Sequence, residues 1–398
     1  MLKTSTPVPA PAARAAAIVL VLTYLGFVSL GLPDAAYGVA WPSLRAAFGL
    51  GQGAFGAGLV AVGAGFMVSS LSAGAALRRF GGGRLLAGST LLAALGLAGF
   101  AVAPNWPVFL LAGLLVGIGG GAIDSGLNAY AAAHYSARQM NWLHAAFGLG
   151  AALGPLAMAW GVANTGWRYG YAAIGLSMGL LGLLFLFTRR LWGAAGPQAT
   201  VEGDAPPLVT AWQALADKRV RLQVATFFVY VGVEIGAGQW AFAVLTQTRG
   251  FSVAAAGFWT GAFWFAIFLG RVVLGLGADR IGSGRLVEWG AVGALVSLGV
   301  FAMDPAGLGV AGLFAAGLAL APIFPMLMHR TPAAVGAGAA SHAIGFQVSA
   351  AMAGGVVLPS LIGMLAARAG LLAVPWALFA ICVFLVALTL AVVRQRAN

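Results

Sequence analysis

The sequence predicts an all-α membrane protein with twelve transmembrane helices in two pseudo-symmetric six-helix bundles. Three observations predict this fold. Hydrophobic residues make up 61% of the 398-residue chain and charged residues only 8%. Apolar runs long enough to cross a bilayer, which takes roughly 20 residues, fill nearly the whole chain, and one loop motif recurs at about half the chain length. A soluble protein of this length would need more polar surface, so the lipid bilayer is the expected environment.

Short segments rich in Arg, Pro, Gly and Asn separate the apolar runs. The 60 glycines fit helices in lipid, where small residues let helices approach closely. The expected spans are residues 16–40, 54–77, 85–104, 107–132, 143–163, 168–188, 221–246, 255–278, 286–303, 306–328, 338–366 and 371–393.

The basic residues predict how the chain is oriented. Twelve spans place both termini on one side, and that side then carries sixteen Lys and Arg residues, whereas only Arg45, Arg168, Arg249 and Arg368 fall outside. Cytoplasmic loops carry such an excess, so both termini are expected in the cytoplasm of a bacterial-type inner membrane. The same distribution explains the net charge of +12 without a nucleic-acid partner.

The predicted domain organisation follows from the spans. Residues 1–15 form a cytoplasmic tail, 16–188 the first bundle, 189–220 a linker with an amphipathic stretch from Trp212 to Arg221, 221–393 the second bundle, and 394–398 a second tail.

An internal repeat relates the two halves. The segment Leu77-Arg-Arg-Phe-Gly-Gly-Gly-Arg-Leu85 matches Ala278-Asp-Arg-Ile-Gly-Ser-Gly-Arg-Leu286 at an offset of 201 residues. This Gly-rich, Arg-bearing loop resembles the signature loop of the major facilitator superfamily, although Arg78 stands where an acid is common. The resemblance implies a latch that holds the halves together in the outward-facing state through charge contacts. The expected latch residues are Arg79, Arg84, Arg271, Asp279, Arg280 and Arg285.

Three of the chain's nine acids, Asp34, Asp124 and Glu234, lie inside predicted spans. A carboxylate within a membrane is costly unless it is paired, hydrated or protonated, and desolvation favours its neutral form. Proton coupling is therefore the predicted role of all three acids. The alternative is a buried acid held by a neighbour for packing alone. Arg271 lies within the eighth span and serves either as a structural latch or as an ion-pair partner.

Helical spacing gives each acid polar, aromatic or small neighbours on its own face. Phe27, Tyr37 and Trp41 share a face with Asp34, and a carboxylate flanked by aromatic rings suits a sugar. Asn128 follows Asp124 by one turn, and Tyr230 and Gly238 lie one turn before and one turn after Glu234. The expected substrate-binding residues are Phe27, Asp34, Tyr37, Asn128, Tyr230, Glu234, Gln239 and Gln347.

Further stretches resemble the fucose, galactose and glucose proton symporter family. They are His144-Ala-Ala-Phe147-Gly-Leu-Gly150, Tyr230-Val-Gly-Val-Glu234 with Trp240, Pro322-Ile-Phe-Pro325, and Gly354-Gly355 before Pro359. The resemblance implies that Asp34 and Asp124 serve substrate and proton, although that family usually has Glu rather than Asp in the fourth helix.

Other kinds of site find little support. No two of the four histidines have metal-ligand spacing. His144 and His342 occupy corresponding positions at the start of spans 5 and 11 and are either cavity-end switches or interfacial residues, with the second favoured. Neither a nucleophile elbow nor a phosphate-binding loop is present. We therefore expect no enzyme, no cofactor and no metal.

These observations predict a secondary active transporter that works by alternating access as a monomer. Its predicted action is proton-coupled uptake of a sugar or similar small polar solute. Two alternatives remain, namely a proton-driven exporter of amphipathic or cationic compounds and a transport-inactive sensor or scaffold.

Overall fold

The computed structural model describes the backbone of residues 10–192 and 210–394, and their side chains except at residues 10–13, 137, 138, 141, 275–279, 337 and 341. The first half contains six long helices. They are α1 (Ala10–Phe48), α2 (Phe55–Phe80), α3 (Gly82–Val102), α4 (Trp106–His134), α5 (Ala137–Asn164) and α6 (Trp167–Phe187), with the short 3-10 helices η1 (Gln52–Ala54) and η2 (Arg189–Trp192).

The second half repeats this order after a short helix, α7 (Ala211–Ala216). Its elements are α8 (Lys218–Thr248), α9 (Val253–Ile281), α10 (Ser283–Met303), η3 (Pro305–Gly307), α11 (Gly309–Leu320), α12 (Ile323–Val335), α13 (Ala337–Ala369) and α14 (Ala373–Arg394). Within the described residues, twelve helical segments are long and apolar enough to cross a membrane, with α11 and α12 together forming one of them. The predicted fold class is confirmed.

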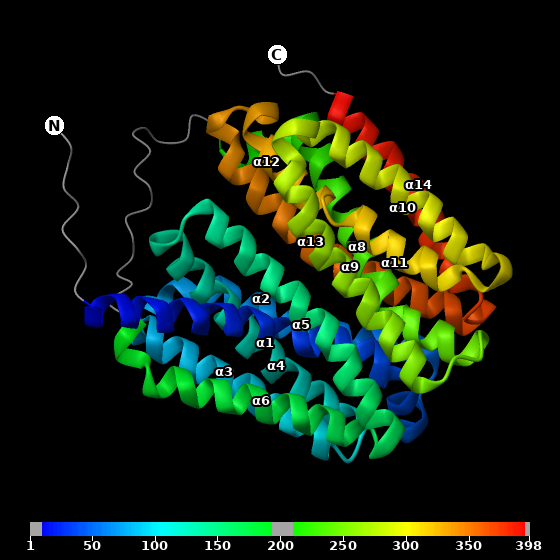
Figure 1. Ribbon diagram of the computed structural model, residues 1–398, viewed down its shortest axis with the longest axis horizontal. Coiled ribbons are helices and arrows are strands. Elements are labelled where there is room, and N and C mark those ends of the chain that lie inside the picture. The colour runs from blue at the N-terminus through cyan, green and yellow to red at the C-terminus, as the bar shows by residue number, and fades with distance from the viewer. Residues whose placement is uncertain (1–9, 193–209, 395–398) are drawn as a thin grey trace.

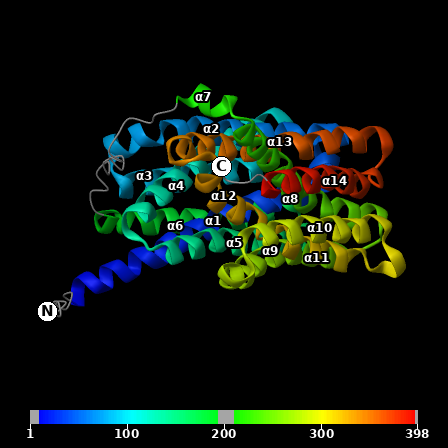
Figure 2. The ribbon, with the colours of Figure 1, turned by 90° about the horizontal axis from the view of Figure 1, so that it is seen from above.

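The two halves diverge at one end of the molecule and meet at the other (Figure 1). We call the end where α1 begins and α14 ends the termini end, and the opposite end the far end. The helices of both halves run between these two ends, and the first turns of α1 project beyond the bundle (Figure 2). Contacts between the halves come from α1 with α8, α5 with α9, and α2 and η1 with α13.

Local sequence explains where several helices begin. The Asn105 side chain accepts a hydrogen bond from the Val108 amide at 3.1 Å and so caps α4. Ser136 and Gln139 form a capping box at the start of α5. Asp217 caps α8 by accepting from the Arg219 amide at 2.8 Å. Each cap satisfies a backbone donor that a helix start leaves without a partner.

Glycine allows the closest helix contacts within the first half. A Cβ atom at Gly117 of α4 would overlap the Val62 carbonyl of α2, and one at Gly150 of α5 would overlap the Val28 carbonyl of α1. These helices therefore touch backbone to backbone, as the glycine content predicts for helices in lipid.

The helix bounds differ from the predicted spans in several places, and three of these differences have a local explanation. The tenth span is two helices, because the chain turns at Ala321 and Pro322, where proline supplies no amide donor. The amphipathic stretch predicted from Trp212 to Arg221 is broken at Asp217, and α8 starts at Lys218, inside the predicted linker. Helix α1 continues to Phe48, eight residues past the predicted span, because hydropathy marks only the apolar part of a helix.

Candidate functional site

Two of the three intramembrane acids lie together in the first half. Asp34 of α1 and Asp124 of α4 are close enough for their charges to interact. The Asn128 amide donates to the Asp124 carboxylate at 3.0 Å and to the Asp124 carbonyl at 2.9 Å. The Asp34 side chain is exposed, although Ala35 and Ala36 beside it are buried. Asp34 therefore borders accessible space at the level of a membrane span.

The third acid belongs to a separate cluster in the second half. The Tyr230 hydroxyl donates to the Glu234 carboxylate and lies 3.2 Å from the Leu320 carbonyl oxygen. The Arg271 guanidinium of α9 lies 3.3 Å and 3.4 Å from the two carboxylate oxygens of Glu234. The sequence left two roles open for Arg271, and in this structure it has the position of an ion-pair partner.

A histidine of the first half lies near the second-half cluster. The His144 ring of α5 meets the Phe27 ring edge to face at 5.4 Å, and the charge of Arg271 acts on its imidazole. Phe27 itself is buried, with 1% of its surface exposed. His144 thus connects a first-half helix to the ion pair of the second half.

At the far end the halves are joined by polar and aromatic contacts. The Gln239 amide of α8 donates to the Asp34 carbonyl of α1 at 2.7 Å, and Gly38, one turn along α1, lies against the Gln239 backbone. The Phe55 and Trp240 rings, one from each half, lie 4.5 Å apart. This end of the interface is therefore closed.

Two residues predicted to bind substrate have polar groups that bond to residues other than the acids. The Tyr37 hydroxyl donates to the Phe55 carbonyl at 2.8 Å, so this side chain packs within the first half. Gln347 is fully buried, and its amide bonds to Gln223 at 2.5 Å and to Thr331 at 2.9 Å. In this conformation the predicted roles of Tyr37 and Gln347 have no geometric support, because packing satisfies their polar groups elsewhere.

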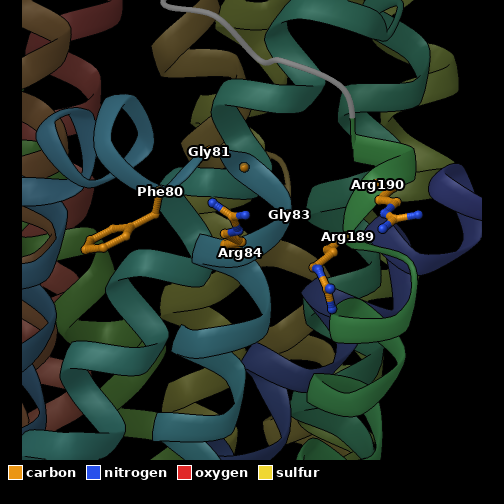
Figure 3. A pocket seen from close by; sticks show the side chains of 7 residues that line it. Phe80, Gly81, Gly83, Arg84, Arg189 and Arg190 are labelled. Carbon is orange, nitrogen blue, oxygen red and sulfur yellow. The ribbon is translucent and has the colours of Figure 1, made fainter.

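The predicted latch residues lie at the termini end, apart from Arg271. Arg84 lines an open hollow of about 270 Å³ with the backbone of Gly81 to Gly83 and with Arg189 and Arg190. Figure 3 shows that the three arginine side chains do not converge on one point. Arg79 lies over the Phe80 ring at 5.6 Å, and Arg280 and Arg285 are exposed. The side chain of Asp279 lies outside the described residues.

The arrangement places hydrogen-bonding and titratable groups between two halves that touch at one end. Within the described part of the chain, Asp34 and Asp124 take part in no ion pair, whereas Glu234 does. Two neighbouring carboxylates repel unless one is protonated. The first-half cluster can therefore hold a proton, and the second-half cluster can hold a charge pair.

Several residues of this region were not predicted from the sequence. Gln52 begins η1 and Phe55 begins α2, and neither carries a motif, yet Phe55 contacts Trp240 and Gln52 accepts from the Trp41 indole at 2.7 Å. His144 was interpreted as interfacial. The only available signal in the sequence was that His144 and His342 occupy corresponding positions in the two halves. Contacts between helices that are distant in the chain leave no local sequence pattern.

Comparisons with known proteins agree with the fold. Solved structures similar to this chain include a D-xylose-proton symporter, with a TM-score of 0.75 and 17% identity over 96% of this chain and 100% of that one. They also include the nucleoside transporter NupG, with a TM-score of 0.75 and 15% identity over 95% and 99%. A bacterial homolog of the lysosomal transporter Spinster has a TM-score of 0.74 and 13% identity over 98% of each chain.

Sequence comparison identifies the family. The Saccharomyces cerevisiae protein Bypass of stop codon protein 6 is 24% identical over 279 residues, which are 64% of this chain and 56% of that protein. The match thus spans little more than half of the yeast protein. The family pattern of the Major Facilitator Superfamily matches residues 23–303. Together with the twelve-helix fold and the internal repeat, this match means that the chain belongs to the Major Facilitator Superfamily.

Proposed function

We propose that this protein is a secondary active transporter that couples the uptake of a sugar or similar small polar solute to protons. The observation that carries the proposal is the pair Asp34 and Asp124, two interacting carboxylates within membrane spans, one of them bordering accessible space. Fold and family support a transporter. The D-xylose-proton symporter, by its name, couples a sugar to a proton on the same fold.

In the proposed cycle the two halves rock about the level of these acids. In this structure the far end is closed by Gln239, Gly38 and the ring pair Phe55 and Trp240. With both termini in the cytoplasm, as the basic residues predict, this conformation is the inward-facing one. Proton uptake by Asp34 and Asp124 from the opposite side would relieve their mutual repulsion and accompany substrate binding. Proton loss to the cytoplasm would favour release.

Glu234 and Arg271 have a different part in this proposal. Their ion pair is neutral as a unit and is held by Tyr230 from the next turn of α8. A paired carboxylate has less need of a proton than an unpaired one. We therefore assign proton binding mainly to the first-half acids and assign Glu234 and Arg271 to the substrate side of the site.

The first experiment identifies a ligand class. A ligand that binds only the folded protein raises its melting temperature, so the purified protein is screened by thermal shift against monosaccharides and lipophilic cations. A monosaccharide that stabilises the native protein but neither Asp34→Asn nor Asp124→Asn supports the proposal. Stabilisation by lipophilic cations alone contradicts it and favours an exporter.

The second experiment tests proton coupling with the ligand found. In proteoliposomes containing a pH-sensitive dye, adding that monosaccharide outside is expected to acidify the lumen when the native protein is present. The control is Asp304→Asn, because Asp304 lies outside the spans and pairs with Arg249 at 3.4 Å. This variant is expected to retain the flux that Asp34→Asn loses. Solute uptake without acidification would contradict proton coupling.

A further inference from the structure

The interface of α5 and α9 changes character along its length. From the far end, Gly257 of α9 lies against Ala159 of α5, and Gly261 lies against the Ala152 carbonyl. Further along, a Cβ atom at Gly148 would be 3.2 Å from the Phe268 Cβ. All these contacts are between small or apolar groups, so the interface is tightly packed up to Gly148.

The next turn towards the termini end carries charge. His144 precedes Gly148 by one turn on α5, and Arg271 follows Phe268 by three residues on the antiparallel α9, so both lie on the helix faces that meet. His144 is exposed, and the Arg271 side chain is 21% exposed. These two residues are the first pair beyond the packed interface, where the halves begin to separate.

The surroundings hold the His144 ring in place and leave Arg271 as its charged neighbour. Phe27 of α1 contacts the imidazole edge to face. Titratable groups on the middle turns of neighbouring helices include Tyr24 and Asp34 of α1 and Glu234 with Tyr230 of α8. Tyr24 donates to the Gln139 carbonyl at 3.2 Å, and Glu234 is already paired with Arg271. Helix α6 carries its titratable residues, Arg168, Tyr169 and Tyr171, near the far end.

We propose that His144 is a positioning residue that makes closure of the termini end depend on its protonation. Closing that end brings the facing parts of α5 and α9 together at His144 and Arg271. An imidazolium there meets a guanidinium, and the repulsion of like charges opposes closure. A neutral imidazole removes the repulsion. Because histidine titrates near neutral pH, the halves close on this side only after His144 has lost its proton.

This inference rests on the alternating access of the proposed function but not on the identity of the substrate or on proton transport by Asp34. It assigns His144 the switch role that sequence spacing left open. A proton bound at His144 from the termini side would keep the transporter open to that side. The device therefore delays the return of the empty transporter until the proton has left.

The test measures the opening directly. Cys382 is fully buried and is the only cysteine, so spin labels can be attached in a Cys382→Ala background at Ala132→Cys and Ala333→Cys, two exposed residues at the termini end of opposite halves. Double electron–electron resonance then reports the distance between the halves in detergent without substrate. It is recorded at about pH 5.5 and about pH 8.5, on either side of the histidine titration range.

The native histidine is expected to give a larger closed fraction at the higher pH, with the ratio of closed to open protein changing at least about threefold. His144→Lys, which carries a fixed charge, is expected to stay open at both pH values, and His144→Gln is expected to lose the pH dependence. The control is His342→Gln. The two loop motifs are offset by 201 residues, so the first-half residue that corresponds to Arg271 is Ser70, which is uncharged. The His342→Gln variant is therefore expected to keep the native pH response.

Two results would overturn the proposal. One is a native distance that does not change with pH, and the other is a native pH response that survives in both His144→Lys and His144→Gln. The spin-label distances are measured without substrate. The result of the sugar-driven proton flux assay on Asp34→Asn therefore does not bear on this test. A failure of the proposed transport function and a failure of this inference are therefore distinguishable.

Discussion

The interiors of the two halves differ in charge although their helices correspond. The first half places Asp34 beside Asp124 with an amide, Asn128, as the bonded neighbour. The second half places Glu234 beside a cation, Arg271. A repeat of the backbone therefore does not require a repeat of the electrostatics. One half has excess negative charge that a proton can neutralise, and the other contains its own counter-charge.

The largest expected effect comes from neutralising the unpaired acids. In Asp34→Asn, sugar-driven acidification of proteoliposomes should fall to the level of empty liposomes, because the variant cannot release a proton. Glu234→Gln is the matched change in the other half. Because Glu234 is assigned to the substrate side of the site, this variant should need more sugar but retain measurable proton flux when the sugar is saturating. Equal loss of flux in both variants would remove the functional difference between the halves.

The second expected effect is on stability and concerns the charge pair. Arg271→Gln leaves Glu234 buried without its partner, which typically destabilises a protein by about 3–5 kcal/mol. The melting temperature should fall clearly, and adding Glu234→Gln should restore much of it. A double variant that is no more stable than the single one would mean that the pair does not hold the second half together.

The third expected effect concerns the buried amide network of the second half. Gln347→Leu removes the buried amide that bonds to Gln223 and Thr331. Thr331 keeps its bond to the Leu327 carbonyl, whereas the Gln223 side-chain oxygen loses the donor shown here. Such a loss costs about 1–3 kcal/mol, measurable as a lower melting temperature. The exposed Gln247 near the end of α8 offers the control Gln247→Leu, which should change stability less. A thermal stability of Gln347→Leu equal to that of the native protein would contradict a stabilising role of this network.

The smallest expected effect concerns contact between the halves rather than within them. Gly38→Ala places a methyl group against the Gln239 backbone at the closed far end. Overpacking of this kind destabilises the packed state by at least about 1 kcal/mol. Spin labels on the two halves at the far end should then show a larger open fraction. Gly88→Ala, where a Cβ atom would meet nothing within 4 Å, should leave the distances unchanged.

The sequence was sufficient for much of the site in each helix. Spacing of four residues predicted that Asn128 would contact Asp124 and that Tyr230 would share a face with Glu234, and both contacts are present. It also raised the possibility that Arg271 has an ion-pair partner. The positions of Tyr37 and Gln347 were not predictable in this way, because each polar group is satisfied by a residue from a distant segment.

The sequence by itself determined the solvent, the number of spans and the duplication, because these depend on local hydropathy and on a repeated motif that one chain displays directly. Only the tertiary structure decided that Asp34 and Asp124 interact, that Arg271 pairs with Glu234, that Gln239 contacts α1 at the closed far end and that His144 lies within reach of the Arg271 charge. The physical reason is that helices in lipid are mostly apolar on every face. Their rotation is set by close packing at small residues and by a few polar contacts, and neither has a period that can be read along the chain.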